Sequence, residues 1–248
     1  MNRFNERAIL SRFVRSLGLT ADQSILDVGC GFGRNLRWLT GEGLHVVGVD
    51  INPRLVETVR DADLECLTVE ELEARDDRFD VLLMSHIIEH FAPHDLLRFL
   101  DAHLDRLKVG GHLIIATPLM WARFFNDFDH VRPYHPRAIL SVFGSDATQV
   151  QFHARNRLEL VDLGLRRMPR GQESIFEEFA PRPRGVVGRC LAVAIRTGLH
   201  AIYRFSGGRL CGRTNGWIGL FRKTAGIAPA LPSPAPAHTT AIADRRAA

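Results

Sequence analysis

Lysine is almost absent from this chain of 248 residues. Of its 32 lysine and arginine residues, only Lys108 and Lys223 are lysines, and the formal net charge is +4. The basic residues do not form the basic and aromatic array that is typical of an RNA-binding module. An arginine-rich balance permits phosphate, nucleic acid or a membrane surface as a partner, and by itself it selects none of them.

Cysteine is scarce too, and its spacing is neither paired nor of the metal-binding type. The four residues are Cys30, Cys66, Cys190 and Cys211. Because Cys30 lies inside a glycine turn, a reducing cytoplasm is favoured over a disulfide framework. Residues 1–15 carry charges throughout and contain no uninterrupted apolar core, so we expect no secretory signal.

Residues 226–248 have little to bury. They are rich in Ala, Pro, Ser and Thr, which predicts a disordered tail. Residues 1–225 are long enough for one α/β domain with additions, and a hydrophobic fraction of 46% is ordinary for a globular protein.

The core of the chain alternates between strand and helix patterns. Strands are predicted at 25–28, 45–49, 64–69, 79–84, 112–116, 158–165 and 216–222. Amphipathic helices are predicted at 4–17, 34–40, 54–62, 96–107 and 137–143. This alternation predicts an α/β fold with a doubly wound parallel sheet.

The stretch from Ile25 to Leu36 combines a strand, a glycine turn and the start of a helix. Gly29, Gly31 and Gly33 lie where the backbone must bend sharply, and they leave no Cβ against a ligand. Nucleotide-like ligands bind at this end of the strands in open α/β sheets. The glycine spacing differs from that of the dinucleotide fingerprint, which makes a dehydrogenase the weakest interpretation.

Asp50 follows the second predicted strand. A carboxylate at this point can accept hydrogen bonds from both hydroxyls of a ribose. The alternative is that Asp50 or Asn52 caps the helix that starts near Pro53. We expect ribose binding, because the glycine turn precedes it.

Ionisable residues cluster directly after the fourth predicted strand. If a helical turn starts there, His86, Glu89 and His90 share one face. Two imidazoles and a carboxylate can bind a divalent cation or supply a general base. The alternative is a capping turn in the pocket wall that holds no metal.

These motifs together resemble class I S-adenosylmethionine-dependent methyltransferases. The segments that carry the resemblance are Ile25–Leu39, Val46–Asp50, Phe79–His90 and Leu107–Pro118. The resemblance implies S-adenosylmethionine as cofactor and a Rossmann-like sheet of seven strands, mostly parallel, with the last strand antiparallel. The methyltransferase domain would be 1–225, with its core at 20–120 and a substrate-facing and insertion region at 119–215.

The resemblance also assigns the cofactor site. The glycines would form the floor under the methionine and the ribose, Asp27 would hold the methionine end, and Ile51 would lie against the adenine. Thr68 takes the place of an acid that this family often has near the adenine amino group. The implied cofactor-binding residues are Asp27, Gly29, Gly31, Gly33, Asp50, Ile51, Thr68, Val69 and Ser85.

Around the fourth strand the chain is similar to ubiquinone-pathway O-methyltransferases and to plant-type small-RNA ribose methyltransferases. Both have a Glu-x-x-Glu-His turn that is associated with a divalent metal, and His86 stands here for the first Glu. His130 would supply a fourth ligand. The candidate catalytic residues and the candidate metal ligands are the same four: His86, Glu89, His90 and His130. His90 acting as a base without metal is the other interpretation.

An aromatic segment follows the fifth strand, at 119–125, and leads into a run with ionisable residues at 129–136. Aromatic and ionisable residues at this place resemble the substrate-facing segment of bacterial family members. We expect a functional role for His130, Arg132 and Tyr134. A packed linker that covers the sheet edge is the alternative.

A long insertion, Met168–Asn215, separates the last two strands, and within it Val186–Phe205 is mostly apolar. Arg189, Arg196, His200 and Arg204 interrupt it within a sector of roughly 80° on a helix. We therefore expect a helix that does not span a membrane. It would be a substrate-capping lid, a dimer surface, or, together with Arg182 and Arg184, an interfacial membrane helix.

The expected reaction is methyl transfer to a hydroxyl, or less readily an amine, of a small or lipid-linked acceptor. An RNA ribose methyltransferase and a non-catalytic cofactor-binding or membrane-associated scaffold are the alternatives, and nucleic acid is not the expected partner. We expect a cytoplasmic protein, and peripheral membrane contact through 182–205 is the alternative to a lid or a dimer surface.

Overall fold

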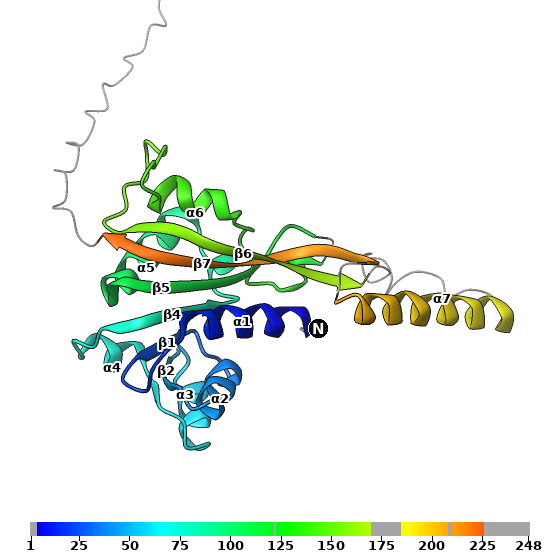
Figure 1. Cartoon of the computed structure of the whole chain (residues 1–248), viewed down its shortest axis with the longest axis horizontal. Helices are drawn as coiled ribbons and strands as arrows, with labels where there is room; N and C mark the ends of the chain where they lie inside the picture. The colour runs from blue at the N-terminus through cyan, green and yellow to red at the C-terminus, as the bar shows by residue number, and fades with distance from the viewer. Residues whose placement is uncertain (1–3, 122, 170–184, 208–209, 226–248) are drawn as a thin grey trace, which may run out of the picture.

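The computed structural model describes residues 4–121, 123–169, 185–207 and 210–225 (Figure 1). In chain order its elements are α1 (Phe4–Leu17), β1 (Ser24–Val28), α2 (Arg34–Gly41), β2 (His45–Val49), α3 (Pro53–Arg60), β3 (Cys66–Leu67), α4 (Val69–Glu73), β4 (Phe79–Ser85), η1 (Ile88–His90), α5 (Pro93–Asp105), β5 (Leu107–Pro118), η2 (Phe124–Asn126), α6 (Pro136–Phe143), β6 (Arg157–Pro169), α7 (Val186–Phe205) and β7 (Gly212–Ala225).

The strands form one seven-stranded sheet in the order β3-β2-β1-β4-β5-β7-β6. The pairs from β3 to β5 are parallel, whereas β7 is antiparallel to both β5 and β6. The predicted α/β fold with a mostly parallel sheet is therefore confirmed. Because β1 lies between β2 and β4, the connections leave the sheet in opposite directions there. In open α/β sheets, ligands bind at the carboxyl ends of the strands at such a point.

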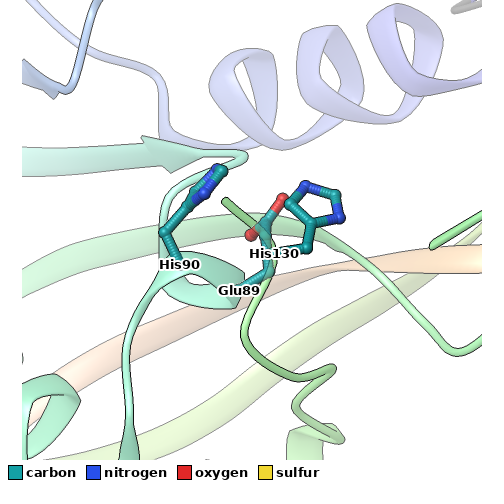
Figure 2. A group of neighbouring side chains, drawn as sticks. All are labelled: Glu89, His90 and His130. Carbon is teal, nitrogen blue, oxygen red and sulfur yellow. The ribbon is translucent and has the colours of Figure 1, made fainter. Parts of the chain in front are cut away.

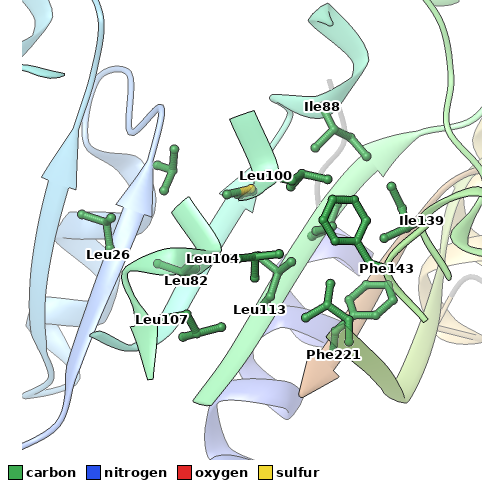
Figure 3. Packing of buried hydrophobic residues seen from close by; sticks show 14 of the residues in the cluster. Leu26, Leu82, Ile88, Leu100, Leu104, Leu107, Leu113, Ile139, Phe143 and Phe221 are labelled. Atoms are coloured by element: carbon green, nitrogen blue, oxygen red, sulfur yellow. The ribbon is translucent and has the colours of Figure 1, made fainter. Parts of the chain in front are cut away.

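Both faces of the sheet are covered, which explains why its central strands lack a polar face. Alternate residues of β1 enter different cores: Leu26 packs with α4, α5 and α6, and Ile25 packs with α1, α2 and α3. Figure 3 shows the first of these cores, in which Leu82 and Leu113 from the sheet lie with Leu100 from α5.

The third strand is shorter than the sequence pattern predicts. The apolar run 64–69 suggested a strand through Val69, but β3 ends at Leu67. Thr68 instead caps α4: its side chain accepts a hydrogen bond from the Glu71 N–H, and the Glu71 side chain accepts one from the Thr68 N–H. This capping box outweighs the strand preference of the apolar run.

The last two strands are longer than predicted and form an antiparallel ribbon. Their pairing continues as far as Pro169 opposite Gly212, past the edge at which β5 ends. α7 follows this ribbon and stands out from the rest of the protein (Figure 1).

The predicted helix at Val186–Phe205 is confirmed, but the prediction that it packs on the domain as a lid is wrong. Among its described side chains only Tyr203 is buried, where the hydroxyl donates a hydrogen bond to the Arg167 carbonyl at 2.6 Å. The four ionisable residues do not decide against membrane insertion either, because α7 is long and apolar enough to span a membrane by length and composition. Arg182, Arg184 and the tail at 226–248 lie outside the described residues.

Candidate active site

The glycine turn after β1 holds its shape through the backbone of the neighbouring strand. The N–H groups of Gly29 and Cys30 both donate to the Val49 carbonyl, at 2.8 and 3.0 Å. Gly29, Gly31 and Gly33 have φ of 66°, 56° and 69°, a region that L side chains rarely adopt. A Cβ on Gly29 would lie 2.1 Å from Ile87 Cδ1, whereas a Cβ on Gly31 would meet no protein atom within 4 Å. The chain thus leaves open space above Gly31, where the predicted cofactor floor lies.

Asp50 is held beside this turn by two backbone donors. Its Oδ2 accepts from the Gly31 N–H at 2.8 Å, and its Oδ1 accepts from the Asn52 N–H at 2.9 Å. Asn52, and not Asp50, caps α3, because its side chain accepts from the Arg54 N–H at 3.1 Å. Each carboxylate oxygen of Asp50 keeps acceptor capacity, which fits two ribose hydroxyls.

Replacing Asp50 with Ala is expected to weaken binding of S-adenosylhomocysteine by roughly 100-fold or more, since two charge-assisted hydrogen bonds are lost. Isothermal titration calorimetry measures this directly. Asp61→Ala is the matched control, because Asp61 is an exposed carboxylate at the other end of α3. An unchanged affinity in Asp50→Ala would mean that Asp50 only stabilises the turn.

Asp27 offers a buried acceptor below the turn. Burial raises the pKa of Asp27 to about 7, against the lowering effect of its hydrogen bond with Asn35 and of the Arg34 charge. Its Oδ2 has no hydrogen-bond partner among the described residues. A buried carboxylate oxygen without a donor is costly, so this atom fits the ammonium group of a bound methionine moiety.

The remaining predicted cofactor residues differ in what they can still offer. Ile51 is 88% exposed and free to lie against a ring, and the buried Ser85 Oγ has no partner among the described residues. Thr68, by contrast, uses its hydroxyl in the capping box of α4, and Val69 is the first residue of that helix. The Thr68 hydroxyl is therefore committed in part to the N-terminus of α4.

The helical turn expected at His86 is not there. His86 has φ of 63°, and η1 begins only at Ile88. Both ring nitrogens of His86 face carboxylates: Nε2 lies 3.1 Å from Glu6 Oε2, and Nδ1 lies 3.3 Å from Glu89 Oε1. A ring so engaged has no nitrogen left for a metal, so the prediction of His86 as a ligand is wrong.

His86 belongs instead to a buried network of charges. Glu6 from α1 also pairs with Arg34 at 3.1 Å and with Arg166 at 3.1 Å. Burial alone would raise the pKa of Glu6, but His86, Arg166 and Arg34 lower it to about 2. Burial alone would lower the pKa of His86, but its hydrogen bonds to Glu6 and Glu89 raise it. With a carboxylate at each ring nitrogen, His86 orients Glu89 and is unsuited to act as a base.

Glu6 and Arg166 are residues that the sequence patterns missed. For Glu6 a signal exists, because it lies one helical turn before Leu10 on the apolar stripe of α1. A carboxylate on a buried stripe calls for a partner. Nothing in the sequence marks Arg166 in this way.

The other three residues of the predicted cluster do come together. Glu89, His90 and His130 each offer a ligand atom, and these atoms lie within 4.8 Å of one another. Figure 2 shows the Glu89 carboxylate between the two imidazoles, with His130 arriving from the segment after β5. Glu89 is fully buried, and its Oε2 accepts a hydrogen bond from Thr117 Oγ1 at 2.9 Å.

Each of these imidazoles has one nitrogen against a backbone carbonyl. His130 Nδ1 lies 2.7 Å from the Phe124 carbonyl, and His90 Nδ1 lies 3.3 Å from the Asp129 carbonyl. A carbonyl can only accept, so Nδ1 carries the proton and Nε2 keeps its lone pair. This arrangement orients histidines both as metal ligands and as bases. The distance from His130 Nε2 to Asp127 Oδ2 is 3.7 Å, which is too long for a hydrogen bond.

Tyr134 and Arg132 have different surroundings from His130. The N–H groups of Val131 and Arg132 donate to the Glu89 carbonyl, at 2.9 and 3.2 Å, so this segment is pinned to η1. Tyr134 is buried, and its hydroxyl donates to the Phe91 carbonyl at 2.9 Å. Its hydroxyl is thus used to hold the segment, which favours a structural role for Tyr134.

Two cysteines that are distant in sequence meet beneath the glycine turn. Cys30 Sγ lies 3.4 Å from Cys66 Sγ, and both thiols are free and buried. Burial and the contact with Cys66 raise the pKa of Cys30. The sequence spacing showed no such pair, because β2 separates the two positions along the chain while the sheet brings them together.

Comparison with known proteins now decides the family. The methyltransferase domain family matches residues 1–161. The chain belongs to this family. The prediction of a class I S-adenosylmethionine-dependent methyltransferase is thereby confirmed, together with its Rossmann-like fold.

Relatives give a more detailed but partial picture. The chain is 34% identical over 114 residues to a ubiquinone biosynthesis O-methyltransferase of Nitrobacter winogradskyi. This match covers 43% of this chain and 42% of that protein. With the protein of the same name in Cereibacter sphaeroides it is 36% identical over 101 residues, which covers 38% and 40% of the two chains. The match spans less than half the length of these curated relatives.

Among solved structures, the fold is similar to that of an S-adenosylmethionine-dependent methyltransferase from Archaeoglobus fulgidus. The TM-score is 0.52 with 19% identity, and the match covers 88% of this chain and 93% of the other. At this identity the likeness shows the fold alone.

Proposed function

We propose that this methyltransferase uses S-adenosylmethionine to methylate a hydroxyl oxygen of a small or lipid-linked acceptor. The observation that carries the proposal is the cluster of Glu89, His90 and His130, which faces the carboxyl edge of the sheet next to the glycine turn. Relatives named ubiquinone biosynthesis O-methyltransferases support an oxygen acceptor.

S-adenosylmethionine, when bound, supplies a methyl group on a positively charged sulfonium. The S–CH₃ bond breaks as the acceptor oxygen forms its bond to the same carbon, and S-adenosylhomocysteine leaves. The chain's own share is alignment: Asp27 would hold the methionine ammonium group, Asp50 would hold the ribose, and the open space above Gly31 would admit the cofactor. Well-oriented reactants gain about 7–11 kcal/mol in this way.

The acceptor hydroxyl must also lose its proton. His90 Nε2 is the base that we assign to this step, since its Nδ1 faces the Asp129 carbonyl and its ring lies at the surface of the site. As an alternative, Glu89, His90 and His130 fit a divalent cation by donor type; His90 Nε2 would then be a ligand and not the base. Such an ion would lower the pKa of a bound hydroxyl.

The test is release of S-adenosylhomocysteine from purified full-length protein offered S-adenosylmethionine and a panel of acceptors. The panel contains phenols, catechols, their prenylated forms and primary amines. We expect turnover with hydroxyl acceptors, more with the prenylated forms. Turnover confined to amines, or none with tight cofactor binding, would contradict the proposal.

The same assay distinguishes His90 as base from a bound ion. If an ion activates the hydroxyl, dialysis against a chelator should lower turnover at least tenfold, and Mg²⁺, Mn²⁺ or Zn²⁺ should restore it. Glu89→Gln should remove the restoration, whereas Glu159→Gln, an exposed glutamate on β6, serves as control. Full activity without bound metal would leave His90 as base and exclude the ion.

A further inference from the structure

α7 carries an apolar face that the described part of the protein leaves uncovered. Exposed apolar side chains follow one another at helical spacing along its whole length: Val187, Leu191, Ile195, Ile202 and Phe205. At 100° per residue these positions fall within a sector of roughly 80°. Val187 and Phe205, near the two ends, are 82% and 93% exposed. The helix thus presents one continuous apolar stripe to its surroundings.

The basic positions of α7 lie on the other side, which two further exposed apolar side chains, Val186 and Val193, share. Arg189, Arg196, His200 and Arg204 occupy a sector of roughly 80° whose centre is about 180° from that of the apolar stripe. The helix contains no acidic residue. A second copy of α7 would match the apolar stripe alone, whereas anionic headgroups above an apolar layer match the sequence of both stripes at once.

The connections of α7 argue against a membrane crossing. Pro169 pairs with Gly212, so the chain leaves and re-enters the ribbon at one place. If α7 crossed a bilayer, the 15 residues from 170 to 184 would have to cross it again. Their sequence contains three arginines and three glutamates. Each charge near the bilayer centre costs about 2.5–3.5 kcal/mol, so the sequence of this segment disfavours a return crossing.

We propose that α7 lies in the surface plane of an anionic phospholipid membrane, with its apolar stripe among the acyl chains. The helix follows the end of β6, on the side of the molecule where β4 and β5 also end (Figure 1). Arg166 of β6 contacts Glu6, which contacts His86. Exposed apolar side chains after β5 lie in the segment that borders the candidate site: Met120, Phe125, Phe128 and Val131. Membrane binding therefore turns the site toward the bilayer.

Flotation of the full chain with vesicles tests the binding without any need for turnover. The probes are phosphatidylcholine vesicles with and without phosphatidylglycerol. We expect binding to the anionic vesicles, at least tenfold weaker binding to the neutral ones, and loss at high salt. The double variant Leu191→Glu, Ile195→Glu should lower binding to the anionic vesicles at least tenfold. Val150→Glu is the control, because Val150 is 84% exposed but lies outside α7.

Two further measurements separate the other occupants and orientations. In the variant Ile195→Trp, the added tryptophan lies at the middle of α7. Its fluorescence should be quenched more by lipids brominated near the headgroup than by lipids brominated near the chain end. The reverse order would overturn the interfacial orientation. A second copy would be favoured, and the proposal overturned, if the protein did not float with vesicles but formed a dimer in light scattering. The double variant Leu191→Glu, Ile195→Glu should then be a monomer. Absence of both would overturn it in favour of an unpartnered helix.

Discussion

His90→Ala is expected to lower kcat by roughly 10²–10⁴-fold, the usual contribution of a positioned general acid or base. Affinity for S-adenosylhomocysteine should stay within about twofold, because the ring lies outside the glycine turn and contacts Asp129 and His130 rather than Asp27 or Asp50. Stopped assays of S-adenosylhomocysteine release and calorimetry give the two quantities separately.

The control for this variant is His153→Ala, since His153 is an exposed histidine in the loop before β6. It should leave both quantities unchanged. Equal losses of turnover and of cofactor affinity in His90→Ala would contradict the assignment of His90 as base, and would indicate that the ring supports the pocket.

Asp27→Asn is expected to raise the stability of the cofactor-free protein and to weaken cofactor binding. The pKa of Asp27 is about 7 in the folded protein and 3.8 in the reference state, so burial penalises its charged form. Between these values the folded state holds a proton that the unfolded state has released, and stability therefore falls as the pH rises from 4 to 7. The total is at most roughly 4 kcal/mol. An amide lacks this penalty, so the cofactor-free variant should unfold at higher temperature at pH 7.5.

The same substitution should weaken S-adenosylhomocysteine binding by roughly 100-fold, since the ammonium group loses a buried carboxylate. In the unaltered protein, the affinity for S-adenosylhomocysteine should increase as the pH rises toward 7, by up to about tenfold per pH unit, because Asp27 must lose its proton to pair with the ammonium group. Above pH 7 the affinity should level off. Thermal unfolding and calorimetry across pH 5.5 to 8.5 measure both effects. A stability that does not fall over this range, or an affinity that falls with rising pH, would show that Asp27 is not the ammonium partner.

The parts of the site that lie close together in sequence could be predicted from it. Gly29 to Gly33 and Asp50 follow adjacent strands, and the carboxyl ends of adjacent parallel strands share one edge of the sheet. His130 was found through the family resemblance, and the structure places it beside His90 with ring centroids 4.9 Å apart.

Contacts that depend on distant elements could not be predicted. The role of His86 is decided by Glu6 on α1, and that of Glu6 by Arg166 on β6, whose side chains meet only once the sheet has formed. Thr68 and Val69 were predicted as part of a strand because an apolar run suggests a strand until the capping box is seen. For α7, periodicity predicted the basic sector on a mostly apolar helix, but only the structure shows that its apolar side chains are uncovered by the described residues.

The tie between α1 and β6 has a consequence for how the chain folds during synthesis. The Arg167 N–H donates to Asn5 Oδ1, a contact that spans 162 residues, and the neighbouring Arg166 neutralises Glu6. Contacts between such distant residues form late, because a long loop must first be closed. α1 leaves the ribosome before β6, yet its buried carboxylate stays incompletely paired until β6 has been made. The central strands can thus pair before the charge network around Glu6 is complete. We therefore expect the protein to become able to bind its cofactor only in one of the last steps of folding.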